Sequence, residues 1–291
     1  MITLNNGRLE VVIHPRGAEL QVLRNLSTGI NHLWSGDARF WGKYSPILFP
    51  IVGQLRDNKY YYNGQEYSLP RHGFARDRTF RAERINDYAA IFTLSDDTET
   101  HSVFPFNFRL QVYYELDADQ LSVRYAVTNT GTGELFFSLG AHPAFAVPLA
   151  IENLPSEYED YSLVFNQSTS LDRWKLADGL LISKTENVPL QDHHLPLRTE
   201  LFKEDALVMK GLPDNSIRIE CSKHPYGLDF SWQDFPFFGI WAAPNASFVC
   251  LEPWSGIADH ADHDQQLTTK EGILSLQPGA DWSASWQVKC F

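Results

Sequence analysis

Apolar and polar residues alternate along several stretches of this chain, and the alternation predicts β-strands. Apolar side chains occupy every second position in residues 108–116, 121–127 and 282–290, and a shorter example holds Leu20 and Val22. Successive side chains of a strand point to opposite faces, so each set should place its apolar residues on one face. No long segment repeats apolar residues at helical spacing. The pattern therefore predicts a protein built from antiparallel strands.

Turn-forming residues separate these stretches at short intervals. The clearest is Asn63-Gly64, which lies between the strand-like residues 60–62 and 67–69 and indicates a two-residue hairpin. Residues 154–195 show less alternation, and we expect loops and a short helix there. We find no linker, internal repeat or low-complexity stretch. The sequence therefore predicts one all-β domain over residues 1–291, an antiparallel sandwich of many strands.

Composition narrows the classes of partner and compartment. The net charge is −12 and no basic run is present, which argues against nucleic acid as a partner. The first residues lack the features of a signal peptide, and no apolar run is long enough to cross a bilayer. The cysteines are odd in number and far apart, at Cys221, Cys250 and Cys290, as is usual in a reducing compartment. We therefore expect a cytoplasmic protein without membrane contact, either a monomer or a homodimer.

Several common site motifs are missing. The chain has no Gly-x-Ser-x-Gly, Walker or Gly-x-Gly-x-x-Gly sequence, so a nucleotide cofactor is unsupported. The run Asp259-His260-Ala261-Asp262-His263-Asp264 holds residue types that bind metals. It lacks a known ligand spacing and a strand context, and we interpret it as a polar surface loop. We therefore predict neither a metal site nor a cofactor.

Two histidines and one glutamate stand in unusual settings. His142 follows Gly140 and precedes Pro143 at the end of an apolar run, and His72 has a similar setting before Gly73. Each histidine alone is most simply a hydrogen-bonded core residue. Glu252, however, lies inside an apolar strand-like run, where an idle carboxylate would be costly. Together the three side chains offer an acid and a base without a covalent nucleophile.

Aromatic residues lie beside each of these motifs. They are Phe74, Phe145, Trp241 and Trp254. A flat aromatic surface next to polar groups suits the apolar face of a sugar ring, although aromatic residues are also common in β cores. Sugar binding is therefore one interpretation of this composition.

Taken together, these motifs resemble the aldose 1-epimerase (galactose mutarotase-like) family, and specifically its LacX-like branch, whose members are associated with bacterial lactose and galactose utilisation. The resemblance extends from about Gly17 to the C-terminus. The supporting motifs are His72-Gly73-Phe74-Ala75-Arg76, Gly140-Ala141-His142-Pro143-Ala144-Phe145, Leu251-Glu252-Pro253, Phe104-Pro105-Phe106-Asn107-Phe108 and Gly53-Gln54-Leu55-Arg56.

The resemblance implies a β-supersandwich and the interconversion of the α and β anomers of a free aldose such as galactose or glucose. His142 is similar to the general acid that protonates the ring oxygen. Glu252 is similar to the general base that takes the proton of the C1 hydroxyl, and His72 to a second histidine near the ring oxygen. We expect His142 and Glu252 to face each other across one cleft, separated by roughly the width of a sugar ring.

The resemblance also suggests residues that bind the sugar. Asp205 is similar to an aspartate that binds sugar hydroxyls. Arg56 matches the position of a sugar-binding arginine, although Arg71 or Arg76 could take its place. Trp241 is the aromatic residue that we expect against the sugar ring. The chemistry implied requires no metal or cofactor.

Three alternatives remain. A hexose 6-phosphate would suit a cluster of Arg71, Arg76, Arg78 and Lys59, unless these cations are surface charges or pair with nearby aspartates. A non-catalytic carbohydrate-binding protein could share the fold, but the intact His142 and Glu252 argue against it. A glycoside hydrolase would need two carboxylates. Only one acid lies in a strong motif.

Overall fold

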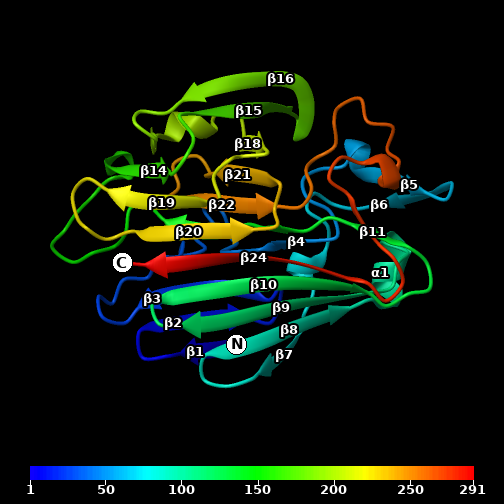
Figure 1. The fold of residues 1–291 in the computed structure, drawn as a ribbon, viewed down its shortest axis with the longest axis horizontal. Coiled ribbons are helices and arrows are strands. Elements are labelled where there is room, and N and C mark those ends of the chain that lie inside the picture. The colour runs from blue at the N-terminus through cyan, green and yellow to red at the C-terminus, as the bar shows by residue number, and fades with distance from the viewer.

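The computed structural model describes residues Met1–Phe291 and consists largely of antiparallel strands in two large sheets (Figure 1). The nine-stranded sheet has the order β17 (His194–Pro196), β14 (Tyr161–Phe165), β19 (Ser216–Cys221), β20 (Leu228–Gln233), β24 (Asp281–Cys290), β10 (Gln120–Asn129), β9 (Phe108–Asp117), β8 (Ala89–Ser95) and β7 (Arg81–Arg84). The eight-stranded sheet has the order β16 (Leu180–Pro189), β15 (Ser170–Ala177), β18 (Leu207–Lys210), β21 (Phe237–Trp241), β22 (Phe248–Trp254), β12 (Gly140–Ala141) and β4 (Ile47–Leu48), with β13 (Ala144–Ala146) also paired to β22.

Smaller elements complete the chain. They are the sheet β1 (Ile2–Asn5), β2 (Leu9–His14) and β3 (Glu19–Asn25), the pairs β5 (Lys59–Tyr62) with β6 (Gln65–Ser68) and β11 (Leu135–Phe137) with β23 (Leu274–Leu276), the helix α1 (Thr98–Val103), and 3-10 turns at Arg56–Asn58, Ala75–Asp77, Tyr158–Asp160, Thr199–Phe202 and Leu267–Thr269. None of these helices is long and apolar enough to cross a bilayer. The predicted all-β supersandwich is confirmed.

The strands predicted from strict alternation are present. Strands β9 and β10 pair along their whole length, and β24 pairs with the other edge of β10. The hairpin predicted at Asn63-Gly64 connects β5 and β6. One detail differs, because a β-bulge between β2 and β3 leaves Gln21 unpaired. Leu20 is therefore fully buried whereas Val22 is only half-buried.

The prediction for residues 154–195 was only partly correct. The region does hold a short 3-10 helix at Tyr158–Asp160, but most of it forms the strands β14, β15 and β16, and β17 begins at its end. Strands β15 and β16 form a long antiparallel hairpin at one edge of the eight-stranded sheet. Most of β16 is exposed or half-buried on both faces, so its sequence needs no apolar alternation. The usual signal of a strand was therefore missing from β16, whereas β14 does alternate between buried and half-buried residues.

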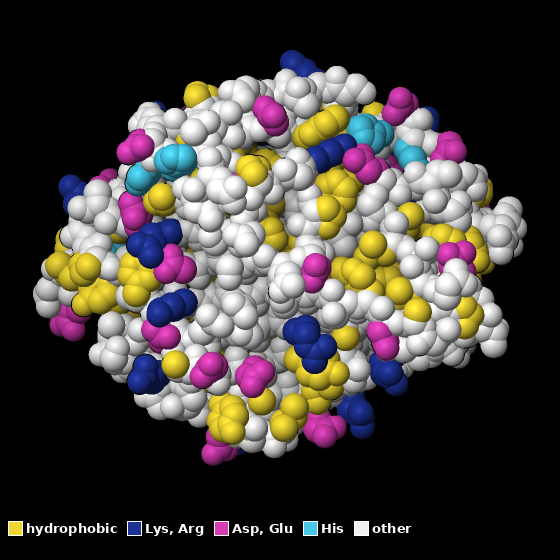
Figure 2. Space-filling model, viewed as in Figure 1, with side chains coloured by type: hydrophobic (Ala, Val, Ile, Leu, Met, Phe, Trp, Pro, Cys, Tyr) yellow, Lys and Arg dark blue, Asp and Glu magenta, His cyan; other side chains and the backbone are white.

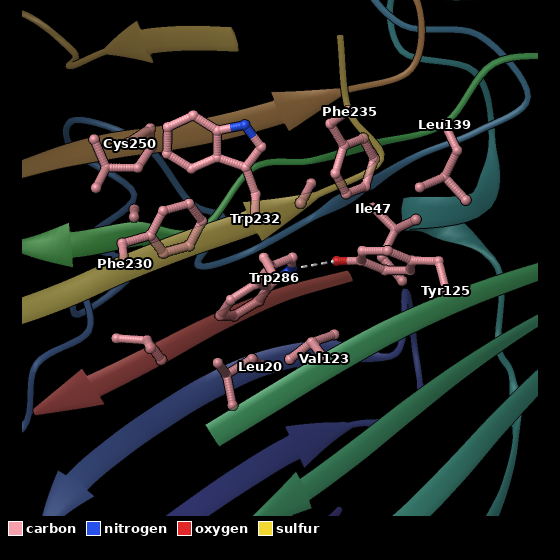
Figure 3. Close-up of a cluster of buried hydrophobic side chains, with 14 of the residues drawn as sticks. Leu20, Ile47, Val123, Tyr125, Leu139, Phe230, Trp232, Phe235, Cys250 and Trp286 are labelled. Atoms are coloured by element: carbon pink, nitrogen blue, oxygen red, sulfur yellow. Dashed lines mark hydrogen bonds between the residues drawn. The ribbon is translucent and has the colours of Figure 1, made fainter. Parts of the chain in front are cut away.

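The two large sheets pack face to face over a core of 71 buried residues. Trp232 of β20 contacts Phe238 of β21, with ring centroids 4.1 Å apart, and Phe230 of β20 contacts Phe145 of β13. The polar atoms of two core side chains bond to each other inside the core, where Trp286 Nε1 donates a hydrogen bond of 2.9 Å to the Tyr125 hydroxyl (Figure 3). A packed core of this size fixes the strands that hold the site.

The other face of the eight-stranded sheet has a separate cluster of 8 buried residues, which includes Val208, Phe237 and Trp254. Small residues let bulky ones lie flat on this face. A Cβ atom on Gly239 would lie 2.3 Å from the Trp254 ring, so the indole occupies the space that a side chain would fill. Gly239 therefore makes room for the Trp254 ring on this side of the sheet.

Charged residues of both signs are interspersed over the molecular face seen in Figure 2. Lys and Arg side chains lie near Asp and Glu side chains there, and no continuous basic patch covers this face. This distribution is consistent with the acidic composition of the chain.

Candidate active site

A cavity of about 520 Å³ opens on the face of the eight-stranded sheet that carries Val208 and Trp254. Seven of the eight site residues proposed from the sequence line it, namely Arg71, His72, Arg76, His142, Asp205, Trp241 and Glu252. They come from four separate parts of the chain, which the strand order brings together. The remaining wall is largely apolar and is made by Trp41, Val52, Gly53, Leu176, Gly179, Ala206, Val208, Trp254, Ile257 and Ala258.

His142 and Glu252 are in direct contact at the base of this cavity. Gly140 of β12 pairs with Trp254 of β22, and this antiparallel register brings the next residues of the two segments side by side. His142 Nε2 lies 3.3 Å from Glu252 Oε2, and both residues are buried. The expected separation by the width of a sugar ring was therefore wrong. The two oxygens of a cyclic aldose that exchange protons are both bonded to C1, so an acid and a base acting on them belong close together.

Burial and contact act on this pair in opposite directions. Burial raises the pKa of the Glu252 carboxyl well above its usual value and lowers the pKa of His142 to about 3. Both shifts favour a neutral carboxylic acid beside a neutral imidazole. The close contact favours the ion pair, because opposite charges stabilise each other most where solvent is excluded. Both forms of the pair hold a single proton.

His72 is oriented by the backbone. The backbone N–H of Gly53 donates a hydrogen bond of 3.1 Å to the ring nitrogen Nδ1 of His72. The backbone N–H of His72 donates in return to the Gly53 carbonyl. Because Nδ1 accepts, the proton of the neutral ring belongs on Nε2. Burial, with the nearby charges of Arg71 and Arg76, lowers the pKa of His72 and keeps the ring neutral. His72 can thus offer one N–H donor to a ligand.

The turn after His72 depends on glycine. His72 has a φ of 70° and Gly73 a φ of 69°, both in the left-handed region. A Cβ atom on Gly73 would lie 2.4 Å from the Phe49 carbonyl oxygen. Only glycine fits this close approach without displacing backbone. The His-Gly sequence of the motif is therefore a local structural requirement of the site.

Charged residues form one side of the cavity. Arg71 Nη2 lies 3.6 Å from Asp205 Oδ2, and the Arg76 guanidinium donates a hydrogen bond to the Arg71 carbonyl. The backbone around Asp205 is held in turn by Arg173, which donates to the carbonyls of Glu204 and Asp205. This side presents both charge signs to a ligand, with guanidinium donors and carboxylate acceptors.

Arg56 lies elsewhere. It does not line the cavity, and its guanidinium donates a hydrogen bond of 2.9 Å to the His263 carbonyl. Its backbone N–H donates to Asp259. The position assigned to Arg56 by sequence similarity is therefore structural, and Arg71 and Arg76 are the arginines at the site.

The segment from Asp259 to Asp264 is only partly the polar surface loop that we predicted. The Asp259 carboxylate is buried and accepts a hydrogen bond of 2.8 Å from the buried Lys270 ammonium, which also donates to the Ile257 carbonyl. This ion pair anchors the chain at Ile257 and Ala258, which form part of the cavity wall. A buried charge is tolerated here because it is paired.

Aromatic rings enclose the imidazole of His142. Trp41 stacks on it, with ring centroids 4.9 Å apart, and Trp241 meets it edge-on at 5.7 Å. Trp254 also lines the cavity, whereas Phe74 and Phe145 belong to the core. Sequence reasoning missed Trp41, which lies in an irregular loop without strand alternation. Its two aromatic neighbours in the sequence, Phe40 and Tyr44, were the only signal.

Comparisons with known proteins agree with this geometry. The aldose 1-epimerase family profile matches residues 1–275. The plasmid-encoded protein LacX of Lactococcus lactis subsp. lactis is 32% identical over 287 residues, which cover 95% of each chain. A galactose mutarotase related enzyme from Lactobacillus acidophilus superposes with a TM-score of 0.94 at 33% identity, covering 100% of this chain and 97% of that one. A galactose mutarotase-like protein from Lactobacillus casei gives 0.89 at 30% identity, covering 100% of both chains. The chain therefore belongs to the aldose 1-epimerase family and resembles its LacX proteins.

Proposed function

We propose that this protein is a mutarotase that interconverts the α and β anomers of a neutral aldohexose such as galactose or glucose. The observation that supports this most is the contact of 3.3 Å between His142 and Glu252 inside a cavity of monosaccharide-binding size. An acid and a base in contact suit a reaction that moves two protons at neighbouring oxygens.

The proposed steps are proton transfers. His142 in its protonated form gives its proton to the ring oxygen while ionised Glu252 takes the proton of the C1 hydroxyl. The bond between C1 and the ring oxygen breaks and C1 becomes an aldehyde. Rotation about C1–C2 presents the other face of the aldehyde, and closure returns each proton to its original group.

The pair holds one proton throughout this cycle. Before opening it is an ion pair, and after opening it is a neutral imidazole beside a carboxylic acid. Burial favours the second form and contact favours the first, so the two effects oppose each other. The His72 Nε2–H is proposed to donate to the ring oxygen. That oxygen gains charge as the C1–O bond breaks.

The charge balance around the cavity supports a neutral substrate. Arg71 faces Asp205, which offsets its charge. Two of the other cations considered for a phosphate are engaged elsewhere, because Arg78 pairs with Glu99 and Lys59 pairs with Glu66. A sugar without phosphate can instead use the mixture of donors and acceptors for its hydroxyls and Trp241 for its apolar face.

Polarimetry of freshly dissolved α-anomers tests the proposal. The panel contains galactose, glucose and their 6-phosphates. We expect acceleration with the free sugars, and a loss of about 10²–10⁴-fold in Glu252→Gln with sugar binding retained, the usual worth of a positioned acid or base. Arg78→Ala, outside the cavity, is the matched control and should retain activity.

Two results would contradict the proposal. Activity restricted to 6-phosphates and lost in Arg76→Ala would assign the substrate to the phosphorylated class. Sugar binding without any acceleration, unchanged in Glu252→Gln, would indicate a carbohydrate-binding protein on the same fold.

A further inference from the structure

One buried thiol beside the proposed catalytic pair has no part in the proposed reaction. Cys250 lies two residues before Glu252 on β22, is fully buried and forms no disulfide. The ligand atoms of His142, Cys250 and Glu252 all lie within 4.8 Å of one another. Residues two apart on a strand share a face, and His142 projects from the neighbouring segment. One nitrogen, one sulfur and one oxygen ligand therefore converge.

We propose that His142, Cys250 and Glu252 form a binding site for Zn²⁺. Zinc bonds of about 2.0–2.3 Å in a tetrahedron place its ligand atoms roughly 3.3–3.7 Å apart. The contact between His142 Nε2 and Glu252 Oε2, at 3.3 Å, already matches such an edge. The other separations among the three ligand atoms are at most 4.8 Å, so the Cys250 thiol has to come closer by on the order of 1 Å. His142 and Glu252 line the cavity whereas Cys250 does not, so an open fourth position would have to face the cavity.

The ligand types select the metal. A thiolate, an imidazole and a carboxylate favour Zn²⁺ or Co²⁺ over Mg²⁺, which prefers six oxygen ligands. Burial raises the pKa of the Cys250 thiol, so the ion itself has to displace the thiol proton to solvent, because the thiolate is the ligand. The carboxylate and the thiolate together offset the charge of the ion. Arg71 and Arg76 oppose cation entry, and Asp205 beside Arg71 reduces that opposition.

Zinc bound here would occupy the groups that move protons. It would take the imidazole nitrogen and the carboxylate oxygen assigned to catalysis, so it should inhibit mutarotation in competition with sugar. This consequence rests on the proposed function, whereas metal binding does not. The site would thus make a metal-independent reaction sensitive to free zinc.

The test uses the full chain, freed of metal with a chelator that is then removed. Titration with Co²⁺ should give a sulfur-to-cobalt charge-transfer band and the visible bands of a tetrahedral site, at one ion per chain. Calorimetry with Zn²⁺ alone should show the same stoichiometry. Cys250→Ala and Cys250→Ser should each lose the band and weaken Zn²⁺ binding by at least about 10-fold, because even an indirect ligand partner is worth about that much. Cys290→Ala, also buried, is the matched control and should retain both signals.

The outcomes separate the two proposals. No charge-transfer band in the unmodified protein, or a band that survives in both Cys250 variants, would overturn the zinc site. Should those variants fail to fold, Glu252→Gln keeps the thiol and must still weaken Zn²⁺ binding. Zinc binding in a protein without mutarotase activity would contradict only the proposed function. Mutarotation indifferent to saturating Zn²⁺ would overturn the inhibition.

Discussion

His142 Nε2 lies 3.3 Å from Glu252 Oε2, and burial disfavours the charged form of both residues. When two titrating groups interact strongly, each observed pKa describes the pair and cannot be assigned to either residue alone. In the proposed reaction the active form is the one that holds a single proton, whichever residue holds it at a given step. The protonation of either residue alone does not define activity.

The pH dependence of kcat/KM should therefore be bell-shaped. At low pH the pair takes a second proton, Glu252 can no longer accept one and the rate falls. At high pH the pair loses its last proton and neither residue can supply one to the ring oxygen. The measurement is the initial rate of anomer interconversion across the pH range, corrected for the spontaneous reaction. In Glu252→Gln only one titrating group remains, so the residual rate should show one limb. A flat profile in the unmodified protein would contradict the shared proton.

His72 allows its two ring nitrogens to be tested separately. Asparagine can accept the Gly53 N–H in place of Nδ1 and tolerates the left-handed φ of 70°, but it offers no donor at Nε2. Glutamine reaches the Nε2 position but loses the acceptor near Gly53. We expect His72→Asn to keep the midpoint of thermal unfolding and lose about 10-fold in kcat, less than the usual worth of a direct acid or base. We expect the opposite pattern for His72→Gln, with a lower midpoint of thermal unfolding and a smaller loss in kcat than in His72→Asn. Equal effects in both variants would argue against a donor role.

Gly73 should be intolerant of any side chain. Gly73→Ala places a Cβ 2.4 Å from the Phe49 carbonyl oxygen at a φ of 69°. We expect a loss of more than about 2 kcal/mol in the free energy of unfolding, since the left-handed φ alone costs roughly 1–2 kcal/mol. Gly64→Ala is the matched control, because its φ is 74° but no atom lies within 4 Å of the added Cβ. Urea unfolding measures both. Equal losses would show that the close approach to Phe49 contributes nothing.

Much of the fold was predictable because its central strands are buried on one face. Strands β9, β10 and β24 alternate strictly, since a packed core excludes polar groups from every second position. Strand β16 was missed because an edge strand that is exposed or half-buried on both faces imposes no such selection, and in β15 the buried positions include the charged Arg173. Alternation of apolar and polar residues indicates a strand that is buried on one face. It gives no signal for a strand that is exposed to solvent on both faces.

Residues of the candidate site could be predicted from the sequence where a polar or charged residue stands in a segment that is expected to be buried. Glu252 could be singled out because a carboxylate in an apolar strand is costly. Trp41 and the apolar wall could not, because their selection depends on packing between distant segments. Arg56 was misplaced because its alignment with a motif does not determine where the side chain points. The distance between His142 and Glu252 was misjudged because the sequence does not give the register of β12 and β22.

His32 should make the protein less stable in acid. It is fully buried, neither ring nitrogen has a hydrogen-bond partner, and burial lowers its pKa from 6.5 to about 4. Because the folded pKa is the lower one, the unfolded chain binds the proton first as the pH falls. The stability contribution is present above about pH 6.5 and is lost between 6.5 and 4, by roughly 3 kcal/mol in full at 1.36 kcal/mol per unit. His32→Phe fills similar space without a titrating group, so its free energy of unfolding in urea should fall less over this interval than that of the unmodified protein. Other buried histidines contribute equally to both proteins, and the difference isolates His32. Parallel curves for the two proteins would show that His32 keeps an ordinary pKa in the fold.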